Sequence, residues 1–159
     1  MSEDKSLSKE EMLAVEETAL RDISGVLEAM DTIVKYEPFK VMRNGKQLFS
    51  FRVRGLDDGE TENCRTEATK FVKSKRLGGV TMPADFNTAK YNSLLIVQAT
   101  HPEDKEFLWG NKELQKKAKV LAPWQVVDKV LLSGEKGRVI ELIEQLSGEE
   151  GTVEAIKNS

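Results

Sequence analysis

The sequence predicts a mainly α (α+β) fold: a compact helical domain with one β-hairpin and an N-terminal amphipathic helix. Apolar residues recur at helical spacing over most of the 159 residues, and helix start and stop residues divide them into segments. One short stretch instead alternates with a period of two around an Asn-Gly pair. Aromatic residues make up only 6% of the chain, so aliphatic helix packing is the expected source of the core.

A long helix is expected near the N-terminus. Ser8 followed by Glu11 forms a capping box, which places the helix start near Lys9. The apolar residues that follow recur every three or four positions: Met12, Val15, Ala19, Ile23, Val26, Met30 and Ile33. This stripe would pack on the protein's own core or bind a partner. We therefore treat residues 1–37 as an acidic N-terminal helical arm.

A β-hairpin is expected after this arm. Residues 39–43 and 48–54 would be its strands, and Asn44-Gly45 suits a type I′ turn, which needs positive φ at both central positions. Phe49, Phe51 and Val53 share one face of the second strand, and Ser50, Arg52 and Arg54 share the other. One face is thus expected to be core and the other basic.

Helices are predicted for the rest of the core domain, residues 38–148. Asp57 or Asp58 would cap a helix from about Glu60 to Ser74, with Gly78-Gly79 ending the run after it. The further helices are expected from Asp85 or Asn87 through a central apolar run at 94–97, over 102–109, over 111–119, from Pro123 to Gly134, and over 136–146. Residues 149–159 are predicted to be a flexible C-terminal tail.

The residues that carry catalysis are scarce. The chain has one cysteine and one histidine, so a metal site or a nucleophile with a base has few candidates. Cys64 with His101 is a conceivable thiol and base pair, but Cys64 fits a buried stripe and His101 a helix boundary better. The acidic cluster Asp57, Asp58, Glu60 and Glu62 suits a helix N-terminus. We expect no enzyme, cofactor or metal.

Localisation in the cytoplasm is expected from three features. The single cysteine cannot form an internal disulfide, no apolar stretch is long enough to cross a bilayer, and the first residues are acidic and polar where a signal peptide would be basic and then apolar. We therefore expect no membrane association.

Charge is unevenly distributed along the chain. Residues 1–37 carry four basic and ten acidic side chains, whereas residues 38–79 carry ten basic and five acidic ones. The basic residues concentrate between residues 43 and 76, a stretch that we call the basic island. It could contact nucleic-acid phosphates, but the pI of about 5.4 and the interrupting carboxylates favour a solvated face or a surface for the acidic N-terminal arm.

Several stretches of the chain resemble one family. They are FRVRGL at 51–56, TEATKFVKSKRLGGVTMPADFNTAKYNSLLIVQAT at 66–100, LWGNKELQKK at 108–117 and DKVLLSGEKGRVIELIEQLSG at 128–148. Together they are similar to the XkdN-like tail assembly chaperones of tailed phages and prophages. The resemblance implies a noncatalytic protein of the host cytoplasm that binds and solubilises the tape measure protein before tail tube polymerisation and is absent from the mature virion.

The resemblance also implies further partners, namely the tail tube protein and a longer frameshifted form of the chain. Association with a second copy is permitted by the charge distribution, because both ends of the chain are acidic and its middle is basic. A holdase for a helical client is expected to take a helix in a groove. As a hypothesis, the groove is lined by Phe71, Leu77, Trp109 and Trp124, with Lys70, Lys73, Lys75 and Arg76 at its rim. The alternatives are a small nucleic-acid-binding regulator using the basic island and a structural component of the tail.

Overall fold

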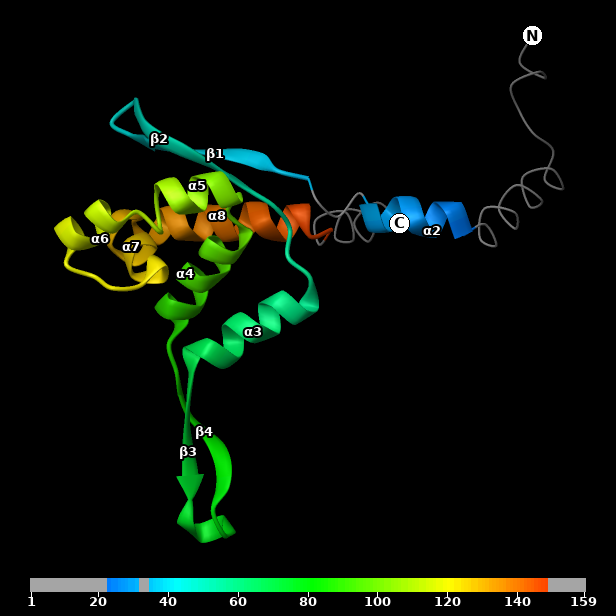
Figure 1. Cartoon of the computed structure of the whole chain (residues 1–159), viewed down its shortest axis with the longest axis vertical. Helices are drawn as coiled ribbons and strands as arrows, with labels where there is room; N and C mark the ends of the chain where they lie inside the picture. The colour runs from blue at the N-terminus through cyan, green and yellow to red at the C-terminus, as the bar shows by residue number, and fades with distance from the viewer. Residues whose placement is uncertain (1–22, 32–34, 149–159) are drawn as a thin grey trace, which may run out of the picture. The chain divides into compact units, whose positions relative to one another are not determined.

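The computed structural model describes residues 23–31 and 35–148 of the chain. Contacts divide the chain into two units, residues 1–34 and residues 35–159, which are described separately. The described residues form seven α-helices and two two-stranded antiparallel sheets (Figure 1). The α+β class is therefore as predicted, but the chain has two hairpins where the sequence analysis expected one.

The first unit contributes one described helix, α2 (Ile23–Asp31). Ile23, Val26 and Met30 of this helix belong to the predicted stripe, and they and the neighbouring Leu27 are all more than half exposed. The expected helix start near Lys9 and the residues up to 22 lie outside the described residues. The predicted tail at 149–159 lies outside them as well.

The first hairpin is the one that the sequence predicts. Strands β1 (Glu37–Arg43) and β2 (Lys46–Val53) pair antiparallel around Asn44 and Gly45, whose φ angles of 54° and 74° are those of the predicted turn. Phe51 and Val53 of β2 are buried, as expected for the apolar face. A bulge between Val41 and Met42 shifts the register.

The first hairpin is held against the helical body by backbone hydrogen bonds. The Arg54 amide donates to the Ala99 carbonyl at 3.0 Å, and the His101 amide donates to the Arg52 carbonyl at 2.9 Å. Beyond the strand, a Cβ on Gly55 would lie 2.5 Å from the carbonyl oxygen of Leu146. Only glycine allows the chain to pass so close to that helix end.

The helices of the body begin and end close to the predicted residues. Helix α4 (Thr88–Ala99) is capped by Asn87, α5 (Pro102–Phe107) has proline in its first turn, α6 (Lys112–Ala118) is capped by Asn111, and α7 (Pro123–Val130) again starts at proline. The exception is Gly134, which was expected to end α7. It lies in the first turn of α8 (Ser133–Leu146), because the side chain of Glu135 accepts from the Leu132 amide and starts that helix earlier.

The main core lies between the first hairpin and α4, α7 and α8. Its buried residues are Val41, Phe51, Val53, Ile96, Ala99, Trp109, Val126, Val127, Leu131, Val139 and Ile143. A smaller cluster joins α3 (Asp58–Ala68) to α4 and consists of Cys64, Ala68, Leu94 and Leu95. As predicted, α4 is the central helix, because it contributes to both clusters.

The segment after α3 (Asp58–Ala68) is where the helix prediction is wrong. The expected helix to Ser74 ends at Ala68, and the chain continues as β3 (Thr69–Ser74), a short 3-10 turn η2 (Lys75–Leu77) and β4 (Val80–Phe86). Gly78 and Gly79 are the turn of this second hairpin, with φ angles of 69° and 87°. In Figure 1 the hairpin extends away from the helices of its own unit.

Among the helices that the structure describes, none combines the length and the apolar character needed to cross a bilayer.

Candidate functional site

The two residues considered for catalysis have structural roles in different places. Cys64 is buried beside Ala68 and Leu95, and this burial raises the pKa of its thiol to about 11, which opposes thiolate formation. His101 caps α5, where its Nδ1 accepts from the Glu103 amide at 3.2 Å. Both placements agree with the packing and boundary roles that the sequence favoured.

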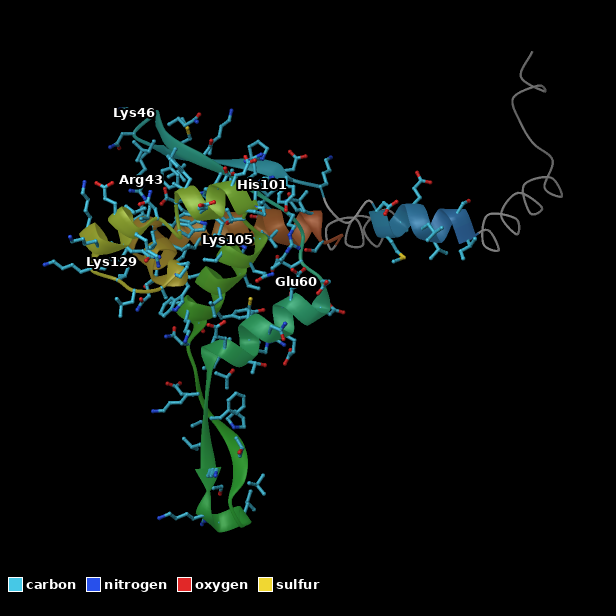
Figure 2. All side chains as sticks on the ribbon, viewed as in Figure 1. Arg43, Lys46, Glu60, His101, Lys105 and Lys129 are labelled. Carbon is cyan, nitrogen blue, oxygen red and sulfur yellow. The ribbon has the colours of Figure 1, made fainter. Side chains whose placement is uncertain are left out.

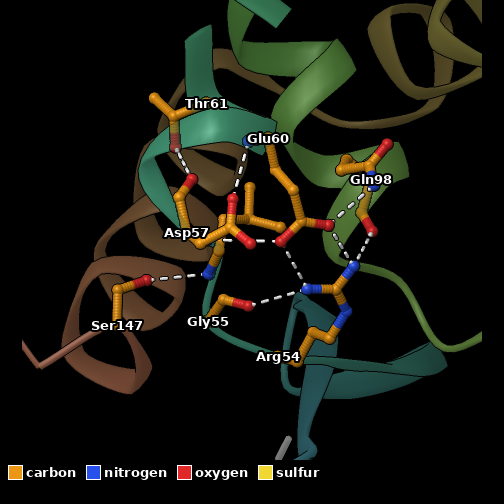
Figure 3. A network of polar contacts seen from close by, with 8 residues as sticks. Arg54, Gly55, Asp57, Glu60, Thr61, Gln98 and Ser147 are labelled. Atoms are coloured by element: carbon orange, nitrogen blue, oxygen red, sulfur yellow. Dashed lines mark hydrogen bonds and ion pairs between the residues drawn. The ribbon is translucent and has the colours of Figure 1, made fainter. Parts of the chain in front are cut away.

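The acidic cluster at residues 57–62 builds a helix cap and an ion-pair network (Figure 3). Asp57 accepts from the Glu60 amide at 2.8 Å, which completes the predicted cap of α3. Arg54 donates to both carboxylate oxygens of Glu60 at 2.9 and 2.6 Å, and Gln98 donates to the same carboxylate at 2.9 Å. The hydrogen bonds from Arg54 are the main cause that lowers the pKa of Glu60 to about 2.

Two more arginines of the basic island are bound to carboxylates. Arg52 donates to Asp104 at 3.0 and 3.1 Å and to Glu103 at 3.2 Å, and its hydrogen bond lowers the pKa of Asp104. Arg43 donates to both oxygens of Glu135, at 3.0 and 2.6 Å. Figure 2 labels Arg43 at the turn end of the first hairpin. These arginines attach the first hairpin to the body.

Trp109 does not line an exposed groove, in contrast to the expectation from the sequence. Its exposure is 0%, and its ring lies 5.3 Å from that of Phe51 in an edge-on contact. Its indole nitrogen donates to Thr100 at 3.0 Å, and its carbonyl accepts from Gln115 at 3.0 Å. An indole so enclosed by the core has no surface to offer a client, so Trp109 is a packing residue.

Trp124 is placed apart from the other predicted groove residues. It is half-buried against the cluster of α3 and α4, with the Lys90 ammonium 5.3 Å from the centre of its ring. A pocket of about 390 Å³ opens between α3, α4 and α8, where Leu56, Tyr91, Leu95 and Ile140 are among its lining residues. None of the four predicted groove residues lines it.

The remaining predicted residues gather on the second hairpin. Phe71 lies on β3 and Leu77 in the turn, with exposures of 45% and 55%. The four predicted rim residues share this hairpin: Lys70, Lys73, Lys75 and Arg76. Within the described residues, no ion pair joins any of these four cations to a carboxylate. The hairpin is therefore a basic surface with apolar side chains among its charges.

Sequence reasoning missed the other apolar residues of this surface. They are Val72, Val80, Met82 and Phe86, and each is between 39% and 56% exposed. A signal was present: β-branched residues lie on both sides of Gly78-Gly79, a pattern typical of a hairpin. Ala68, Phe71 and Val72 are also spaced as on one face of a helix, and the sequence analysis therefore continued the helix to Ser74. We call residues 69–86 the exposed hairpin.

Comparison with known proteins supplies the family. A family model described as phage XkdN-like tail assembly chaperone protein, TAC, matches residues 25–157, which include both hairpins and all helices from α3 to α8. No curated protein and no solved structure gave a significant match. Because the family model matches most of the 159 residues, the chain belongs to the XkdN-like phage tail assembly chaperones.

Proposed function

We propose that this chaperone binds the phage tape measure protein in the cytoplasm of the host bacterium and keeps it soluble until the tail tube polymerises. The family match over residues 25–157 carries the proposal. Tail assembly chaperones are noncatalytic, so binding is the activity to explain. A long helical client exposes apolar stripes before assembly, and a chaperone must cover them to prevent aggregation.

The exposed hairpin supports this proposal because it combines exposed apolar side chains with free positive charge. We propose that Phe71 and Leu77 contact the client and that the nearby cations attract its acidic segments, namely Lys70, Lys73, Lys75 and Arg76. Trp124 belongs to a separate surface beside Lys90. The buried Trp109 is left out of the contact set.

Co-expression with the tape measure protein of the same phage or prophage tests the proposal. The tape measure protein should aggregate when made alone and should co-elute with the chaperone in pull-down and size exclusion when the two are made together. The matched control is co-expression with an unrelated soluble protein of similar charge. A tape measure protein that stays insoluble beside a soluble, folded chaperone would contradict the proposal.

Nucleic-acid binding is less well supported by the structure. Three arginines of the basic island, Arg43, Arg52 and Arg54, are bound to carboxylates and are not available to phosphates. A nucleic-acid-binding regulator would show steeply salt-dependent binding to DNA or RNA. A structural component of the tail would be found by mass spectrometry of purified particles, from which we expect this chaperone to be absent.

A further inference from the structure

We propose that the exposed hairpin inserts between two acidic amphipathic helical segments of the client, one on each of its faces. This inference rests on the proposed function and specifies how the client is bound. It replaces the expected single groove, because the residues that remain exposed do not line one concave surface. Those on the strands lie on the two opposite faces of a two-stranded sheet, and Leu77 lies in the turn.

The strand register shows that both faces carry apolar side chains. Beyond a bulge between Lys70 and Phe71, Phe71 pairs with Pro83 and Val72 pairs with Met82. Successive side chains in a strand point to opposite faces, so these two apolar pairs lie on opposite sides of the hairpin. On the face of Val72, Val80 adds a further apolar side chain, since it pairs with Ser74 two residues along.

Within the described residues the apolar side chains of the hairpin are largely uncovered, although the Phe86 ring at its base lies 5.4 Å from that of Tyr91. Neither strand contains a buried residue, and every residue of β4 is exposed. A two-stranded hairpin without a covered face is marginally stable in water. Apolar side chains on both faces would gain most from a partner that covers both, and a single helix covers only one.

The charge of the exposed hairpin selects the kind of partner. It carries four basic residues, Lys70, Lys73, Lys75 and Arg76, against one acidic residue, Asp85. A second copy of the hairpin would bring like charge to like charge, which costs free energy in a contact. An acidic partner is favoured instead.

The edges of the hairpin favour a helical occupant over an added strand. Pro83 interrupts β4 because it has no amide proton to donate to a neighbouring strand. On β3, Lys70 and Lys73 place charge along the other edge, and charged side chains at an edge oppose strand addition. Helical segments that pack on the two faces do not require backbone hydrogen bonds with these strand edges.

One serine variant on each face tests the proposal in the full chain. Phe71→Ser removes the apolar group from one face and Val72→Ser from the other, and Thr81→Ser is the matched control in the same hairpin. Each face variant should weaken tape measure binding at least about tenfold in a titration, because a central apolar contact carries about 1.4 kcal/mol or more. Thr81→Ser should bind like the unmodified chaperone.

The outcomes separate this proposal from the proposed function. Loss of affinity in only one variant would overturn insertion and support a single binding face. Full affinity in both would show that the hairpin is not the site, although chaperone activity would stand. No binding by the unmodified chaperone would overturn both. Circular dichroism and thermal melts confirm that the variants fold, which is expected because both residues are exposed.

Synthetic peptides test the charge of the occupant. A helix-forming peptide of about 20 residues, with leucines at helical spacing and glutamates elsewhere, should bind the chaperone, and its counterpart with lysines should not. Equal binding of both peptides would overturn the acidic class. A chaperone dimer that dissociates on Phe71→Ser would also overturn the proposal, because a second copy would then be the occupant.

Discussion

The two hairpins of this chaperone share a local architecture and differ in what surrounds them. In the first, β1–β2, the apolar face is buried against Ile96, Trp109 and other core residues, and three arginines are bound to carboxylates of the helices. In the second, β3–β4, no residue is buried and no basic side chain forms an ion pair within the described residues. One hairpin belongs to the core and the other to the surface.

The same two-stranded motif can therefore contribute to the folded core where its apolar face is buried, or leave apolar side chains accessible where no element covers it. Burial of Phe51 and Val53 makes the first hairpin part of the folding unit. Phe71 and Val72 cannot stabilise the fold in this way, because water still reaches them. Exposed apolar side chains lower the solubility of a protein. Surface patches of such side chains therefore mark interaction sites.

Hydrogen exchange should give the largest difference between the hairpins. Amides paired within β1–β2 should exchange only through openings close to global unfolding, which costs about 5–15 kcal/mol for a typical domain. Amides paired within β3–β4 should exchange through local openings that cost far less. Exchange measured by NMR on the free chaperone checks this, and equal protection in both hairpins would contradict the comparison.

A matched pair of phenylalanine substitutions should give the next largest effect. Phe51→Ala removes a fully buried ring beside Trp109 and should lower the free energy of unfolding by about 3–5 kcal/mol. Phe71→Ala removes a ring that is 45% exposed and should change it by about 1 kcal/mol or less. Urea denaturation measures both, and similar losses would show that the second hairpin is part of the core.

Acidic pH should weaken the ion pair between Arg54 and Glu60 that helps attach the first hairpin to the helices. The pKa of Glu60 is lowered from 4.5 to about 2 in the folded state, so its carboxylate stabilises the fold above about pH 4.5, and this contribution is lost as the pH falls towards 2. Glu60→Gln should lower the free energy of unfolding by about 1–2 kcal/mol at neutral pH and by less as the solution becomes more acidic. Denaturation at several pH values checks this.

Glu62→Gln is the control for that measurement, because Glu62 pairs with Arg65 on the exposed side of the same helix. It should leave the unfolding free energy almost unchanged at every pH. A Glu60→Gln variant whose stability followed the pH dependence of the unmodified chaperone would show that Glu60 is not the group that titrates.

Much of the fold was predictable because its signals are local. Asn44-Gly45 predicts the first turn, since few other residues tolerate positive φ at both positions. Asn87, Asn111, Pro102 and Pro123 predict helix starts through capping oxygens and the fixed φ of proline. These preferences depend on neighbouring residues alone.

The second hairpin was not predictable in the same way. Residues 68–74 fit a helical stripe as well as a strand, and intrinsic preferences for strands depend on context. The pairing of Phe71 with Pro83 forms between residues on either side of a long turn. Of the surface proposed to bind the client, the sequence analysis named the four cations and two apolar residues, but it placed Lys70, Phe71 and Lys73 on a helix.

The family, the basic character of residues 43–76, most helix boundaries and the first turn follow from the sequence, because each depends on residue identity or short-range geometry. Which charges and which aromatic rings remain accessible depends instead on contacts between distant parts of the chain. Arg43, Arg52 and Arg54 are bound to carboxylates, and Trp109 is enclosed by the core. Burial and ion pairing join residues far apart in the chain, so local preferences could not reveal that the exposed hairpin keeps its charge and its apolar side chains accessible.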